Sequence, residues 1–317
     1  MTTPRRTGRR EPAMVPDVEF RSYYGRPIVK ASPWQADIPA YLFLGGLAGA
    51  SSLLAAGADL TGNAALRRPS RITALAAILA SFVALVHDLG KPSRFHHMLR
   101  VAKATSPMSV GTWILTVYGP LAGLAAASEA GALLPRRLAD GVVGRLLPPV
   151  GRGAGLIASV LGPAVASYTA VLLADTATPA WHSARDELPF VFVGSAAAAA
   201  GGMGMLCAPV ASARPARRLA VAGAVFELAV HSRMESTMGL VAEPLHQGRA
   251  GGYTKAARTL TATGAVLAAA AGGRSRTASA IAGVALLAGS AATRFGIFYA
   301  GQQSADDPRY TILPQRT

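Results

Sequence analysis

The sequence has one cysteine among its 317 residues, and only 15% of the residues are charged. A single thiol, Cys207, can neither close an intrachain disulfide nor supply the several thiolates of an iron–sulfur cluster, so both features are excluded. Aromatic residues are also few, at 6%, whereas hydrophobic residues make up 51% and the small residues Ala and Gly are frequent. Long apolar runs rich in small residues predict membrane-spanning helices that pack closely together.

Residues 1–36 contain no apolar core of the kind that a cleaved signal peptide has, and they carry several Arg and Lys residues. We therefore predict a basic, largely extended tail. The chain has a formal net charge of +15, but its basic residues lie between apolar spans and form no continuous patch. Membrane lipid and topology account for that pattern, so nucleic acid is not an expected partner. Basic residues flank the spans on both sides, so the positive-inside rule selects no orientation.

Eight segments are long and apolar enough to cross a bilayer, which takes about 20 residues each. They lie at 37–59, 70–88, 108–130, 153–175, 188–210, 218–240, 256–273 and 276–299, and the seventh is the weakest. The predicted fold is an all-α integral membrane protein, multi-pass in the cell (inner or plasma) membrane. Its eight-helix transmembrane domain covers 37–300, and a short C-terminal tail covers 301–317. Because eight is even, both termini are expected on one side.

Polar residues within the predicted spans gather towards the side that holds both termini. Charged groups inside hydrocarbon are costly, so their placement points to function. The residues concerned are Asp37, Tyr41, His87, Asp88, Tyr168, Asp175, Glu227, His231, Arg233, Glu235 and Arg294. On the other side we expect Asp59 and Glu129 near helix ends, where water reaches them, and an otherwise nearly inert half. This asymmetry predicts a functional site near one face.

The sixth span places Glu227, His231 and Glu235 at four-residue intervals, and therefore on one face of the helix. Histidine titrates near neutral pH and carboxylates exchange protons with it, so this ladder suits proton transfer. The other interpretation is structural: Arg233 and Arg294 would ion-pair with these carboxylates and hold helices together. Both interpretations remain open at the level of sequence.

Histidines raise the question of a bound metal or haem. His87 and His231 are placed where they could ligate a haem, but His87 equally suits a role at the end of the second span beside Asp88. His96 and His97 lie in a basic loop without cysteines or carboxylates at ligand spacing, so we predict surface residues. No metal or haem is expected.

Three sequence blocks cover most of the first 190 residues. Residues 34–49 read WQADIPAYLFLGGLAG; residues 88–95 read DLGKPSRF, continued by MLR at 98–100 and TSPMSVGTW at 105–113; and residues 167–173 read SYTAVLL, ahead of Pro179 and Trp181. In this order they resemble the first-helix signature, the loop between helices two and three, and the fourth-helix element of the NrfD/polysulfide-reductase membrane-subunit family. The later half resembles that family mainly in helix count and polar placement.

The resemblance implies a quinone-reactive subunit of two four-helix bundles, without haem of its own. Such a subunit binds menaquinone or ubiquinone near one membrane face and docks an iron–sulfur ferredoxin-like subunit. That partner connects it to a molybdopterin catalytic subunit of formate dehydrogenase or polysulfide reductase type. Tyr168 matches the family tyrosine that hydrogen-bonds a quinone carbonyl, and Tyr41 falls where a first-helix residue contacts the quinone. Asp37 stands where many relatives carry Glu, and Lys91 departs from the usual loop, which leaves docking specificity open.

The chemistry of these residues suits a quinone, which needs an apolar cleft, hydrogen-bond donors at its carbonyls and a proton path. The predicted quinone-binding residues are Tyr41, Tyr168 and His87. The predicted proton-transfer residues are Asp37, Glu227, His231 and Glu235. The residues predicted to dock the partner, mostly through positive charge, are Asp88, Lys91, Arg94, Arg100 and Lys103.

Two other classes of protein fit part of this pattern. An ion or proton-coupled transporter also carries intramembrane Asp, Glu and His, but it usually needs polar routes to both faces, and these residues lie towards one. A passive membrane anchor for soluble subunits requires no embedded tyrosine, histidine or carboxylate. It predicts that Tyr168→Phe leaves quinone reduction intact.

Overall fold

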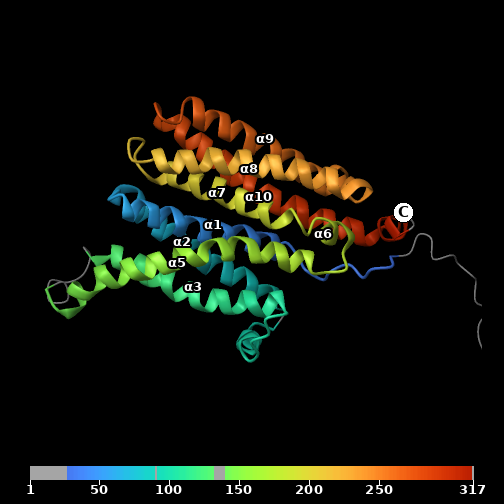
Figure 1. The fold of residues 1–317 in the computed structure, drawn as a ribbon, viewed down its shortest axis with the longest axis horizontal. Coiled ribbons are helices and arrows are strands. Elements are labelled where there is room, and N and C mark those ends of the chain that lie inside the picture. The colour runs from blue at the N-terminus through green and yellow to red at the C-terminus, as the bar shows by residue number, and fades with distance from the viewer. Residues whose placement is uncertain (1–26, 90, 132–139, 316–317) are drawn as a thin grey trace, which may run out of the picture.

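The computed structural model describes residues 27–89, 91–131 and 140–315, and every regular element in these ranges is a helix (Figure 1). The long helices are α1 (Asp37–Leu60), α2 (Ala64–Asp88), α3 (Pro107–Glu129), α5 (Val142–Ala174), α7 (Leu188–Cys207), α8 (Arg214–Met238), α9 (Gly248–Ala270) and α10 (Arg276–Asp306). The shorter elements are η1 (Pro92–Leu99), α6 (Pro179–Ser183), η3 (Gly239–His246), α11 (Arg309–Ile312) and η4 (Leu313–Gln315). The all-α prediction is confirmed. Most of the basic tail predicted at 1–36 lies outside the described residues.

Six of the long helices in the described chain are both long and apolar enough to cross a membrane: α1, α2, α3, α5, α7 and α10. This confirms the prediction of a multi-pass membrane protein. The predicted spans at 218–240 and 256–273 correspond to α8 and α9, which have 25 and 23 residues but are more polar. Their charged residues account for the difference: Arg214, Arg217, Arg218, Glu227, Arg233 and Glu235 in α8, and Arg249, Lys255 and Arg258 in α9.

Several helices extend beyond their predicted bounds, and α5 and α10 illustrate this at either end. α5 begins at Val142, ahead of the predicted start at 153, and α10 continues to Asp306, past the predicted end at 299. Hydropathy marks the part of a helix that suits lipid, whereas backbone hydrogen bonding continues as long as each N–H finds the carbonyl four residues earlier. A helix can therefore be longer than its apolar segment.

The first helix, α1, lies at the centre of the packing. It contacts α2 and α5 and also α7 and α10. Figure 1 shows α1, α2, α3 and α5 along one side of the molecule and α7 to α10 along the other. Small residues permit the closest approach: a Cβ added to Gly49 of α1 would overlap the carbonyl of Gly162 of α5, and the converse holds for Gly162.

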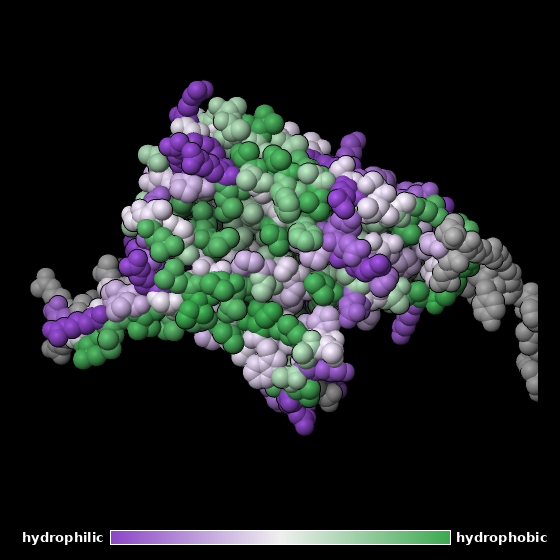
Figure 2. All heavy atoms as spheres, viewed as in Figure 1, coloured by the Kyte–Doolittle hydropathy of each residue, from purple (hydrophilic) through white to green (hydrophobic). Residues whose placement is uncertain are grey.

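The long helices alternate in direction, which gives the molecule two ends (Figure 1). One holds the start of α1 together with η1, α6, η3 and α11, and we call it the α6 end. The opposite end holds the turns from α1 to α2, from α7 to α8 and from α9 to α10. Figure 2 shows hydrophobic side chains over the middle of the flank formed by α3 and α5, and hydrophilic ones towards the ends. A helical protein surrounded by lipid at its middle has this distribution.

The opposite end contains a network of ion pairs. Arg67 lies 3.1 Å from Asp59 and 2.7 Å from Glu129, and Arg71 reaches the same two carboxylates at 3.5 and 2.9 Å. Arg152 of α5 adds a contact to Asp59 at 3.3 Å. The side chains of Asp59 and Glu129 are each 8% exposed, so the prediction that water reaches them in a nearly inert half is wrong. Helix packing buries both carboxylates between arginines.

Candidate functional site

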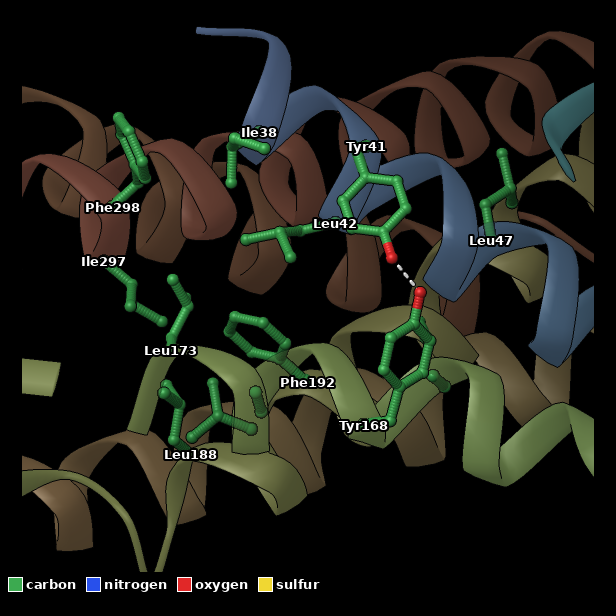
Figure 3. Close-up of a cluster of buried hydrophobic side chains, with 14 of the residues drawn as sticks. Ile38, Tyr41, Leu42, Leu47, Tyr168, Leu173, Leu188, Phe192, Ile297 and Phe298 are labelled. Carbon is green, nitrogen blue, oxygen red and sulfur yellow. Dashed lines mark hydrogen bonds between the residues drawn. The ribbon is translucent and has the colours of Figure 1, made fainter. Parts of the chain in front are cut away.

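Two tyrosines from different helices meet in the core. Tyr41 on α1 and Tyr168 on α5 are both buried, and their hydroxyl groups hydrogen-bond each other across a sequence separation of 127 residues (Figure 3). The ring of Tyr168 fits because position 111 on α3 is glycine, where any Cβ would overlap the ring. Because the two hydroxyls are in contact, a headgroup could lie between them only if they moved apart. A ligand can therefore reach this pair only by approaching one of the two rings from its side.

A cavity of about 560 Å³ lies beside Tyr168, between α3, α5 and α6. Its titratable lining residues are Tyr168, Asp175, His182 and Arg185, and most of the others are apolar. Asp175, His182 and Arg185 are exposed, so the cavity opens to the surface at the α6 end. Polar groups thus gather at one end of an otherwise apolar space.

An apolar groove of about 430 Å³ continues from this cavity along α3. The cavity and the groove share Ala104, Val110 and Ile114, and the groove extends past Trp113 to Val117. A cavity with a polar end and an apolar continuation fits a molecule with a flat polar head and a long apolar tail.

Asp37 and His87 form a separate pair near the start of α1. His87 Nδ1 lies 3.0 Å from Asp37 Oδ2, and the two side chains are 76% and 35% exposed. Asp37 precedes Tyr41 by four residues, so both lie on one face of α1. Of the predicted quinone-binding residues, Tyr168 lines the cavity, whereas Tyr41 and His87 are not among its described lining residues. The order from the cavity to the surface is therefore Tyr168, Tyr41, Asp37 and His87.

The predicted ladder on α8 runs from the middle of that helix to the α6 end. Glu227 is buried and accepts a hydrogen bond from Thr293 Oγ1 at 2.6 Å. Further along α8, His231 Nε2 lies 3.6 Å from Glu235 Oε1. The exposed His246 of η3 brings its Nε2 to 3.4 Å from the same oxygen. The ladder therefore continues beyond α8 to a residue that contacts solvent.

The two arginines predicted to form ion pairs have different surroundings. Arg233 is exposed, and its Nε lies 3.7 Å from the Glu187 carboxylate. Arg294 is fully buried, and its Nη2 donates to the backbone carbonyl oxygen of Phe192 at 2.8 Å. Its guanidinium also lies 3.6 Å from the centre of the Phe192 aromatic ring. The arginine that ion-pairs with the α8 ladder is instead Arg258, through the carboxylate at position 235.

The predicted docking residues surround η1, which stands away from the long helices at the α6 end (Figure 1). Lys91, Arg100 and Lys103 are exposed, and Asp88 is half-buried at the end of α2. The side chain of Arg94 lies outside the described residues. The exposed cations extend from the same end of the molecule at which the cavity opens.

The sequence grouped Asp175 with the polar residues near this face but gave it no role, and it assigned neither His182 nor Arg185 to the site, although all three line the cavity. The signal that pointed nearest to them was the block that ends with Pro179 and Trp181, since His182 is the next residue. Their convergence depends on how the end of α5 and the short helix α6 fold over α3. Spacing along the chain does not reveal that.

A family model described as "Polysulphide reductase, NrfD" matches residues 29–269, more than half of the chain. No curated protein matches the chain. The matched range contains every predicted site residue except Arg294. The family implies interaction with quinones in general and membership of a multisubunit reductase complex. With its several membrane-spanning helices, the chain belongs to the NrfD family of polysulphide reductase membrane subunits.

Proposed function

We propose that this subunit exchanges electrons between the membrane quinone pool and an iron–sulfur partner subunit attached to a molybdopterin enzyme of formate dehydrogenase or polysulfide reductase type. The headgroup of menaquinone or ubiquinone binds in the cavity beside Tyr168, and the isoprenoid tail lies in the apolar groove along α3. The observation that carries this proposal is the continuity of the polar-ended cavity with that groove. The groove lies on the flank of α3 and α5, so the tail enters from lipid.

Tyr168 donates a hydrogen bond from its hydroxyl to one quinone oxygen. The hydroxyl of Tyr41, which hydrogen-bonds that of Tyr168, holds it in position. Because the two hydroxyls are in contact, a proton can pass between them and continue to Asp37 one turn away. Asp37 is paired with the exposed His87, which exchanges the proton with water. These four residues carry the proton of one of the two quinone oxygens that gain or lose a proton when a quinone and a quinol interconvert.

The partner subunit docks at the α6 end, over η1 and the mouth of the cavity. Lys91, Arg100 and Lys103 offer positive charge there, together with Arg94, and a complementary acidic surface on the partner orients the complex. This arrangement keeps the cluster of the partner close to the headgroup, because the cavity opens at the same end. Electrons then cross a short distance between the partner's cluster and the headgroup.

The eight long helices cross the membrane as two four-helix bundles, α1 to α5 and α7 to α10. Within the second bundle, Glu227, His231 and Glu235 conduct protons from the middle of α8 to His246 at the α6 end. In the rival structural interpretation, Arg258 and the ladder carboxylates only hold α8 and α9 together.

A second candidate function, proton-coupled or ion transport, draws on one observation. Among the described residues, Glu227 Oε2 and the Nε and Nη1 atoms of Arg294 are buried without a hydrogen-bond partner. Buried charged groups of this kind mark ion pathways in membrane proteins. The ladder leads from Glu227 to one end only, whereas alternating access needs routes to both faces, so quinone chemistry remains the better account.

The test is Tyr168→Phe in the purified intact complex, with quinone-linked turnover measured beside turnover with an artificial acceptor. We expect quinone-linked turnover to fall about 100-fold, the lower end of the contribution of a positioned proton-transfer group, with artificial-acceptor turnover unchanged. The matched control is Tyr118→Phe, because Tyr118 is also buried and also loses one hydrogen bond, to Ser52 at 2.7 Å, away from the cavity. Unchanged quinone-linked turnover in Tyr168→Phe would rule out this site.

A further inference from the structure

The short helix α6 is fastened to α10 and to the segment before α1. Trp181 Nε1 donates to the carbonyl oxygen of Ile297 at 2.9 Å, and its ring stacks on Trp34 with 5.9 Å between ring centres. The backbone N–H of Ala180 donates to Ser304 Oγ at 3.1 Å. The next residue along the chain, His182, is therefore held at a defined place on the wall of the cavity.

The orientation of the His182 ring determines which nitrogen carries its proton. Its Nδ1 lies 3.2 Å from the carbonyl oxygen of Ala174. A carbonyl oxygen can only accept a hydrogen bond, so Nδ1 carries hydrogen and donates. In the neutral ring Nε2 then has a free lone pair and can accept a proton.

A second hollow, of about 270 Å³, lies between α6, η3 and α11. Thr176, Ser183 and Tyr310 give it a partly polar lining. Of the described residues that line the cavity and this hollow, His182 is common to both. One imidazole ring thus touches the proposed quinone space on one side and a separate opening of the α6 end on the other.

The groups that face His182 leave it as the proton acceptor. Tyr168 comes from α5, Asp175 from the residue that follows α5, Arg185 from the segment after α6 and Tyr310 from α11, while η3 adds an apolar side chain. Burial raises the pKa of the Tyr310 hydroxyl, so that group stays neutral. Asp175 and Arg185, which line the same cavity, carry opposite charges.

We propose that His182 is the proton-transfer residue for the quinone oxygen that Tyr168 does not serve, and that the second hollow is the opening through which it exchanges protons with water. This inference rests on the quinone site proposed above. It supplies the second of the two proton routes that quinone chemistry needs, and it keeps that route open when a partner covers the mouth of the cavity.

In the direction of quinol oxidation, His182 Nε2 takes the proton of the nearer hydroxyl as that O–H bond breaks and an N–H bond forms. Tyr168 passes the other proton to Tyr41 and Asp37. Two electrons leave for the iron–sulfur partner, so the quinol loses two protons and two electrons in all. His182 then releases its proton to water in the second hollow. In the direction of quinone reduction each transfer runs in reverse.

The first experiment needs no turnover. The intact complex is treated with diethyl pyrocarbonate, which carbethoxylates accessible histidine nitrogens, with and without a short-chain ubiquinone analogue, and modification is read by mass spectrometry. We expect the analogue to lower modification of His182 about tenfold and to leave the exposed His246 of η3, which lines neither the cavity nor the groove, unchanged as an internal control. Equal modification of His182 with and without the analogue overturns the inference.

The second experiment is His182→Asn, whose amide can still donate to the Ala174 carbonyl but offers no base. We expect quinone-linked turnover about 100-fold lower, with a changed pH profile and normal artificial-acceptor turnover. Tyr168→Phe is measured in parallel. If Tyr168→Phe lowers turnover but His182→Asn keeps the wild-type rate and pH profile, only the role of His182 fails. If neither variant changes turnover, the quinone site itself fails.

Discussion

Replacing Gly111 by alanine is expected to disable the cavity while the helices stay folded. The new Cβ on α3 would overlap the ring of Tyr168, so the ring must move. It cannot move back towards α1 without pressing on the buried Tyr41 hydroxyl, so it moves into the cavity. The hydroxyl that meets the quinone is then displaced.

The magnitudes separate stability from function. Alanine favours a helix over glycine by about 0.5–1 kcal/mol, whereas overpacking a core costs about 1–3 kcal/mol. The free energy of unfolding should therefore fall by about 0–2.5 kcal/mol. A displacement of about 1 Å at a reacting group can lower a rate about 100-fold. We thus expect a large loss of quinone-linked turnover with a small loss of stability.

The matched control is Gly123→Ala on the same helix, where an added Cβ meets nothing within 4 Å. That variant gains the same helix propensity without a clash, so it should be slightly more stable and fully active. Both variants are assayed as purified complexes for thermal unfolding and for turnover with quinone and with an artificial acceptor. Equal quinone-linked turnover in the two variants would refute the reasoning that links Gly111, the Tyr168 ring and the cavity.

Two further predictions concern the charge clusters. Glu129→Gln removes the buried negative charge that Arg67 and Arg71 share, and it should lower the free energy of unfolding by about 1.5–3 kcal/mol, as for hydrogen bonds to charged groups. Thermal unfolding in detergent should show no comparable change for Glu243→Gln, whose ion pair is half-exposed. Glu235→Gln interrupts the α8 ladder, so the complex in liposomes should move fewer protons per electron while quinone-linked electron transfer continues. A loss of thermal stability with an unchanged number of protons per electron would instead favour the structural interpretation of the ladder.

The sequence by itself determined that the chain is helical and lies in a membrane. Few charges and long apolar runs allow only structures that satisfy every backbone group internally, which for these segment lengths means helices. The signature blocks placed Tyr168 and Tyr41 in a family context, and the four-residue spacing on α8 placed Glu227, His231 and Glu235 on one face. These inferences depend only on neighbours along the chain.

Tertiary structure alone decided which of these residues meet. Hydropathy could not show that Tyr41 and Tyr168 touch, that Gly111 leaves room for a ring, or that His182 lines both the cavity and the second hollow. Each of these depends on the packing of segments far apart in sequence. The same holds for Asp59, which looks accessible near a helix end but is buried among arginines from α2 and α5. The position of a residue near a helix end predicts its depth in the membrane, whereas only the packing of the helices shows which groups surround its side chain.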